Sequence, residues 1–141
     1  MLYTPMTKAA MKLCFEAHKD QVDRSGVPYV FHPFHVAEQM TSEAEVCVAL
    51  LHDVMEDTDL TADDIRAAGM SEEVVEALLL MTHDADVDYL DYVRALRDNP
   101  LARAVKIADL THNSDLTRLD VVSEKDRRRV EKYAAALGLL R

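Results

Sequence analysis

The stretch VCVALLHDVMEDT (residues 46–58) decides how this chain folds. Its first half is apolar on every side of a helix, which is typical of a helix buried at the centre of a domain. Ser42 and Glu45 form a capping-box pattern just before it. We therefore expect a buried central helix that runs from Val46 to about Met55.

The second half of this stretch carries four ionisable side chains within six residues: His52, Asp53, Glu56 and Asp57. On one helix, His52 and Glu56 share a face, as do Asp53 and Asp57. The three carboxylates repel one another and oppose the negative end of the helix dipole. No Lys or Arg lies between Arg24 and Arg66 to balance them. A bound cation would compensate the charge if they are buried, and a solvated acidic loop is the alternative.

The rest of the chain favours helices as well. Apolar residues recur at helical spacing, and capping residues and prolines separate the runs. Besides residues 46–55, the expected helices span residues 5–21, 32–40, 61–69, 71–82, 86–99, 101–113 and 123–137. Three glycines and four prolines are few for a β-rich fold. We expect an all-α fold, a single compact helical bundle of about eight helices that forms one domain over residues 1–141.

Composition and charge exclude several classes of function. With 49% hydrophobic and 30% charged residues, the chain is globular. A formal net charge of −10 repels nucleic acids and anionic membranes, so neither is an expected partner. We find no apolar run of about 20 residues and no secretory signal. Cys14 and Cys47 lack metal-type spacing and are expected to be buried, reduced thiols. The expected location is cytoplasmic.

Two further segments hold candidate metal ligands. Asp109 lies in an otherwise apolar helical turn, where a lone aspartate is unusual without a partner. That partner could be a metal, or Lys106 or Arg103 in a structural salt bridge. His32 stands just before Pro33, at the start of the second expected helix; a lone histidine is more often a packed or surface residue. Together with His52 and Asp53, these residues form a nitrogen and oxygen donor set that suits Mn, Fe, Zn or Mg.

The order of these residues resembles the HD superfamily of metal-dependent phosphohydrolases. It is closest to the RelA/SpoT-type hydrolase domain and its free-standing small alarmone hydrolases. The shared strings are AHKDQ (17–21), GVPY (26–29), HP (32–33), ALLHDVMEDT (49–58), VKIAD (105–109), Asn113 and RVEKY (129–133). They follow one another in the family's order through nearly the whole chain.

The resemblance implies an HD-type bundle that removes the 3′-pyrophosphate of guanosine 3′,5′-bis(diphosphate) with one Mn²⁺. By the same resemblance, the metal ligands are His32, His52, Asp53 and Asp109. Glu56 and Asp57 match the pair that positions or deprotonates the attacking water. The positions that match substrate-binding residues are Arg24, Lys106, Asn113, Arg129 and Tyr133.

Two positions depart from the family's pattern. Asp23 and Asp115 stand where related hydrolases usually carry arginine, and both changes fall on substrate contacts. An arginine can stack on a base and carries a positive charge, whereas an aspartate does neither. There are therefore two alternatives to hydrolysis of guanosine 3′,5′-bis(diphosphate): hydrolysis of another phosphorylated nucleotide, and nucleotide sensing without turnover. The expected partner is in each case a small phosphorylated nucleotide, and the sequence sets no oligomeric state.

Overall fold

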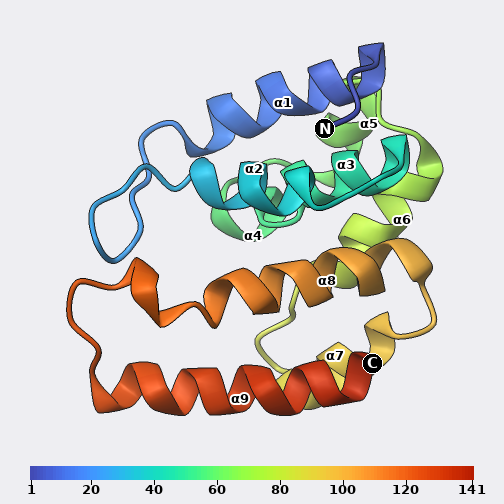
Figure 1. Ribbon diagram of the computed structural model, residues 1–141. Coiled ribbons are helices and arrows are strands. Elements are labelled where there is room, and N and C mark those ends of the chain that lie inside the picture. Colours follow the sequence, from blue (N-terminus) through green and yellow to red (C-terminus); the bar gives the residue numbers. More distant parts are fainter.

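The computed structural model describes residues 1–141 and confirms the all-α fold (Figure 1). Its nine α-helices are α1 (Pro5–His18), α2 (Phe31–Glu38), α3 (Glu43–Leu51), α4 (Val54–Asp57), α5 (Ala62–Ala67), α6 (Glu72–Met81), α7 (Tyr89–Leu96), α8 (Pro100–Asn113) and α9 (Glu124–Leu140). A short 3₁₀ helix, η1 (Leu116–Arg118), follows α8. Outside the helices, a single β-bridge joins Val22 to Pro28.

Helix α3 lies at the centre of the bundle, as its apolar sequence predicts. It packs against α1, α2, α6 and α8, and every residue from Val46 to Leu51 is at most 1% exposed. Helix α9 packs on the far side of α8, beside α7 (Figure 1). The bundle is therefore layered, with α8 between the α1–α3 layer and α9.

Side-chain caps fix where most helices begin. A capping box opens α1, α3, α5 and α9, through Thr4, Ser42, Thr61 and Ser123 respectively. Each hydroxyl oxygen accepts a hydrogen bond from a first-turn amide that has no partner within its helix. Ser71, Asp88 and Asn99 serve α6, α7 and α8 in the same way.

The expectation of one continuous helix from Val46 to Met55 is wrong. Helix α3 ends at Leu51, and a separate turn, α4, begins at Val54. Asp53, between them, has φ −104° and ψ 0°, a sparsely populated region that active-site residues often occupy. His52 contacts Asp109 on α8, and Asp53 accepts a hydrogen bond from Tyr29 in the loop before α2, so the apolar pattern does not decide the backbone here.

Several other boundaries also differ from the sequence expectation by one to three residues. Helix α1 ends at His18 instead of near Gln21, and α7 begins at Tyr89, after its Asp88 cap, instead of at Asp86. Helix α9 continues through Gly138 to Leu140. A helical glycine costs about 1 kcal/mol relative to alanine, but the fully buried Leu140 side chain more than offsets this.

Two simple properties of the chain agree with its composition. Both cysteines are buried and unpaired, as expected. None of the helices combines the length and the apolar character that crossing a membrane requires.

Truncating the central helix tests this packing. We expect Leu50→Ala, at a side chain 1% exposed, to lower the free energy of unfolding by about 2–5 kcal/mol, because it leaves a cavity in α3. Chemical denaturation measures the change. The control is Leu79→Ala on α6, at a side chain 49% exposed, which should change stability by no more than about 0.5 kcal/mol. Equal effects at the two sites would contradict a core centred on α3.

Candidate metal centre and substrate cavity

Four side chains from three separate segments meet between α2, α3 and α8. His32, His52, Asp53 and Asp109 each offer one ligand atom, and these four atoms all lie within 4.8 Å of one another. Asp109 Oδ1 is 2.8 Å from His32 Nε2 and 3.2 Å from His52 Nε2. His52 Nε2 is also 3.1 Å from Asp53 Oδ2. The residues that the sequence singled out thus converge on one point.

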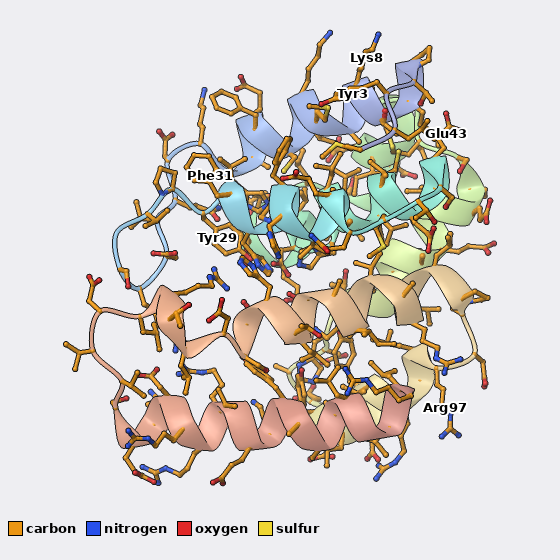
Figure 2. The ribbon with its side chains drawn as sticks, viewed as in Figure 1. Tyr3, Lys8, Tyr29, Phe31, Glu43 and Arg97 are labelled. Carbon is orange, nitrogen blue, oxygen red and sulfur yellow. The ribbon has the colours of Figure 1, made fainter.

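A second layer of polar groups orients these ligands. The His52 Nδ1–H donates to the Ala49 carbonyl at 2.6 Å, which turns Nε2 toward the cluster. Tyr29 donates its hydroxyl to Asp53 Oδ2; Figure 2 shows Tyr29 just before α2, at the edge of the layer between α2 and α8. Asn113 Nδ2 donates to Asp109 Oδ1 at 3.1 Å. Such partners fix the orientation of ligand side chains.

Lys106 forms an ion pair with the second carboxylate oxygen of Asp109, Oδ2. Its Nζ is 2.9 Å from Asp109 Oδ2 and lies 5.4 Å from the ring centre of Tyr92, in a cation–π contact. The structural salt bridge that the sequence left open is therefore present, alongside the histidine contacts. Lys106 contacts Asp109 but is not one of the residues that line the cavity described below.

The cluster without a metal is held together by charge. Burial alone would raise the pKa of the Asp109 carboxyl, but Lys106 and His52 hold that pKa well below its usual range. Burial would also raise the pKa of the Asp53 carboxyl, but the His52 imidazole outweighs it and lowers that pKa to about 2. Burial lowers the pKa of His52, but Asp53 and Asp109 raise it well above its ordinary value. His52 therefore carries a proton between two carboxylates.

The donor set fits a divalent cation. Two imidazole nitrogens and two carboxylate oxygens, without a thiolate, are ligands that Zn, Mn and Fe accept. Metal–ligand bonds to such atoms are about 2.0–2.2 Å long, so a shared ion needs only small shifts of the side chains. The ion would also replace the His52 proton as the charge that balances the two aspartates.

The two acidic residues after the HD dipeptide, Glu56 and Asp57, have different surroundings in the structure. Glu56 Oε1 accepts the His83 amide at 2.5 Å, which ties it to the segment after α6. The Asp57 carboxyl interacts with the cluster electrostatically: partial burial and the Asp53 carboxylate raise its pKa. A carboxyl group with a raised pKa is a better proton acceptor than an ordinary one.

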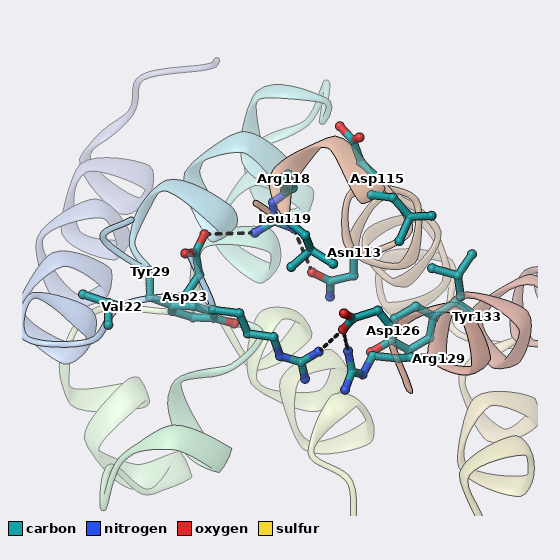
Figure 3. A pocket seen from close by; sticks show the side chains of 13 residues that line it. Val22, Asp23, Tyr29, Asn113, Asp115, Arg118, Leu119, Asp126, Arg129 and Tyr133 are labelled. Atoms are coloured by element: carbon teal, nitrogen blue, oxygen red, sulfur yellow. Dashed lines mark hydrogen bonds and ion pairs between the residues drawn. The ribbon is translucent and has the colours of Figure 1, made fainter. Parts of the chain in front are cut away.

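A cavity of about 410 Å³ opens beside the cluster (Figure 3). Its walls are the loop before α2, the end of α8 with η1, and the first turns of α9. Tyr29 and Asn113 line it and also hydrogen-bond Asp53 and Asp109 of the cluster. The volume suits a small-molecule ligand, and these two residues connect the cavity to the cluster.

Two arginines on one wall of the cavity share a single carboxylate. Asp126 Oδ1 is 3.2 Å from Arg24 Nη1 and 2.9 Å from Arg129 Nη1 (Figure 3). Its other oxygen accepts hydrogen bonds from Ser123, which caps α9. Asp126 was missed at the sequence level. Its capping-box spacing was visible, but the 102-residue separation from Arg24 hid the second contact.

Asp23 and Asp115, the two departures from the family's pattern, both stabilise turns. Asp23 Oδ1 accepts the amides of Ser25 and Val27, and Asp115 caps η1 through Thr117. Arg118 lines the cavity next to them, 3.1 Å from Asn113 Oδ1 and 3.9 Å from Asp23 Oδ2. The sequence assigned no role to Arg118, because its position matches no family motif.

Asn113, Arg24, Arg129 and Tyr133, expected to bind substrate, all line this cavity. A helical bundle that gathers a His, an HD dipeptide and a distant Asp around one point defines an HD-type phosphohydrolase.

Comparisons with known proteins specify the family. The chain is 33% identical over 135 residues to the mouse guanosine-3′,5′-bis(diphosphate) 3′-pyrophosphohydrolase MESH1, covering 84% of this chain and 74% of that protein. It is 35% identical over 108 residues to the human MESH1, covering 68% and 60% respectively. No family model matches the chain. The chain belongs to the family of guanosine-3′,5′-bis(diphosphate) 3′-pyrophosphohydrolases.

Two other matches show how much of a longer relative and of a solved structure this chain covers. The Aquifex aeolicus guanosine-3′,5′-bis(diphosphate) 3′-pyrophosphohydrolase is 28% identical over 134 residues, which are 87% of this chain but 19% of that protein. The chain thus spans less than a fifth of this longer relative. The solved structure of a metazoan ortholog of SpoT matches with a TM-score of 0.79, covering 100% of this chain and 88% of that chain at 23% identity. That likeness shows the fold.

The proton on His52 sets the pH dependence of metal binding. Because its pKa is raised, His52 keeps this proton to a higher pH than a free imidazole does, and a metal must displace the proton from Nε2. We expect Mn²⁺ binding to release about one proton, so that affinity rises about tenfold per pH unit below the His52 pKa. Calorimetry in buffers with different ionisation enthalpies measures the release. A binding heat that is the same in every buffer would contradict this assignment.

Proposed function

We propose that this chain hydrolyses guanosine 3′,5′-bis(diphosphate) to guanosine 5′-diphosphate and pyrophosphate, with one Mn²⁺ held by His32, His52, Asp53 and Asp109. The observation that carries the proposal is the contact between the cluster and a cavity that contains three arginines: Tyr29 and Asn113 line this cavity and hydrogen-bond Asp53 and Asp109. The printed activity of the mouse MESH1 protein supports the same reaction.

A divalent metal in this cluster supplies Lewis-acid activation of a water molecule and neutralises charge on the attacked phosphoryl group. Mn²⁺ is one of the ions that this donor set suits, and it is the ion that the family resemblance implies. Tyr29 and Asn113, which hydrogen-bond Asp53 and Asp109, line the neighbouring cavity that would hold the substrate.

In the proposed reaction, a water oxygen forms a bond to the phosphorus attached to O3′, and the P–O3′ bond breaks. Asp57 accepts the proton from the water, since its pKa is raised by burial and by Asp53. Glu56 is held by the His83 amide, and it orients Asp57 and the water from the neighbouring position. The O3′ oxygen takes up a proton as the pyrophosphate leaves.

Arginines that line the cavity supply the charge that the rest of the substrate needs. Arg24 and Arg129 each direct one Nη1 to Asp126 and keep their other N–H groups for phosphate oxygens. Asn113 and Tyr133 line the same cavity. These cationic groups allow a chain of net charge −10 to bind a polyanion.

A second candidate function follows from Asp23 and Asp115. Both carboxylates are engaged in turns, and the guanidinium next to Asp23 is that of Arg118, 3.9 Å from Asp23 Oδ2. This difference favours a change of base preference within the same reaction class. Another phosphorylated nucleotide as substrate is therefore the alternative.

A substrate screen tests the proposal. Purified protein with Mn²⁺ is incubated with guanosine 3′,5′-bis(diphosphate), a deoxynucleoside triphosphate, a 3′-nucleotide and NADPH, and released phosphate and pyrophosphate are measured. We expect pyrophosphate from the first substrate only. Asp57→Asn should lower kcat by about 10²–10⁴-fold, the usual contribution of a general base, and Asp53→Ala should abolish turnover.

Each other outcome has a distinct meaning. Turnover of only another nucleotide supports the second candidate function, and binding without turnover supports a nucleotide-sensing module. An Asp57→Asn variant as fast as the wild type would show that this carboxylate is not the base.

Asp126 gives a separate prediction for substrate binding. We expect Asp126→Asn to raise KM several-fold with little change in kcat, because it frees two arginines that hold the substrate equally in the ground and transition states. Asparagine can still accept the capping hydrogen bonds of Ser123. The matched control is Asp64→Asn in the capping box of α5, away from the cavity, which should leave KM unchanged. A lowered KM for Asp126→Asn would mean that Asp126 competes with the substrate for the arginines.

A further inference from the structure

His112 lies directly against His32, one of the proposed metal ligands. It follows Asp109 by three residues on α8, and its Nδ1 is 2.8 Å from His32 Nδ1. The two imidazole planes differ by only 3°. The other side of the His112 ring stacks on His35, with the ring centres 4.0 Å apart.

Two ring nitrogens at this distance must share one proton between them. A neutral imidazole has one N–H donor and one lone-pair acceptor, so one of the two Nδ1 atoms donates and the other accepts. His32 is 2% exposed, and its two nitrogens have no partners other than Asp109 and His112. The tautomer of His32 therefore sets the tautomer that His112 must adopt.

Without a metal, the direction of this hydrogen bond follows from Asp109. His32 Nε2 is 2.8 Å from Asp109 Oδ1, and a carboxylate can only accept, so Nε2 carries the proton of a neutral His32. His32 Nδ1 then accepts, and His112 donates from its Nδ1. His112 Nε2, which makes no hydrogen bond within the protein, is left as an acceptor for water.

With a metal, the direction reverses. The ion needs the lone pair of His32 Nε2, so the His32 proton must lie on Nδ1 and be donated to His112 Nδ1. His112 then carries its own proton on Nε2. A carboxylate or a carbonyl, the usual partner of a metal-bound histidine, could serve only this second state.

We propose that His112 is a positioning residue for the metal centre: it donates to His32 Nδ1 when the site has no metal and accepts from it when the metal is bound. The pair exchanges tautomers without a net change of charge, so His32 keeps a hydrogen-bond partner in both states. The inference rests on the metal site of the proposed function, and it is independent of the substrate.

Metal affinity in three variants tests the role of His112. In His112→Asn, the side-chain amide places an oxygen or a nitrogen where Nδ1 lies and can turn to suit either state. His112→Phe keeps a ring but removes both functions, and His35→Phe keeps the stacking partner without touching His32. Binding of Mn²⁺ is followed through the electron paramagnetic resonance signal of the free ion, so no turnover is needed.

We expect His112→Phe to weaken Mn²⁺ binding by about 10–100-fold, the usual effect of losing such a partner. His112→Asn should stay within a few-fold of the wild type, and His35→Phe should be unchanged. Wild-type affinity in His112→Phe would overturn the inference while leaving the metal site intact. If the wild type itself binds no Mn²⁺, both the proposed metal centre and this inference fail.

A second measurement needs no variant. Long-range ¹H–¹⁵N spectra of the histidine rings show which nitrogen carries the proton, and Zn²⁺ serves as a diamagnetic probe in place of Mn²⁺. Addition of Zn²⁺ should move the His112 proton from Nδ1 to Nε2 as His32 Nε2 becomes bound to the ion. The same His112 tautomer with and without Zn²⁺ would contradict the exchange.

Discussion

A carboxylate in the interior is the constraint on which the rest of this structure depends. Asp109 is 4% exposed, and a buried charge without partners destabilises a fold strongly. Here it has four partners, which are His32, His52, Lys106 and Asn113. Since His32 comes from α2 and His52 from the end of α3, Asp109 is satisfied only when these helices pack on α8 in this arrangement. The requirement that stabilises the bundle also assembles the ligands.

The same constraint explains the break in the central helix. The apolar residues of α3 pack equally well in a longer helix, but His52 and Asp53 must reach Asp109 and Tyr29. The chain leaves the helical path at Asp53 and resumes it at Val54. Local propensity is thus overruled at the place where the chemistry lies, which is where such conflicts are expected in natural proteins.

Much of the fold could be predicted from the sequence, because apolar periodicity and capping residues are local signals. The four residues of the cluster could also be predicted, since His32, His52, Asp53 and Asp109 stand out as polar residues in apolar or constrained segments. The contacts that the sequence missed all join residues far apart in the chain. His112 meets His32 across 80 residues and Arg24 meets Asp126 across 102. The periodicity of the sequence does not indicate such long-range pairs, and a single histidine or capping aspartate does not by itself point to one.

The central claim is that one divalent ion binds where these four side chains converge. Crystals of the protein soaked with Mn²⁺ and measured at a wavelength where manganese scatters anomalously test it most directly. The account predicts one strong anomalous peak within bonding distance of His32 Nε2, His52 Nε2 and a carboxylate oxygen of both Asp53 and Asp109. A peak elsewhere, or none at a saturating Mn²⁺ concentration, would contradict it.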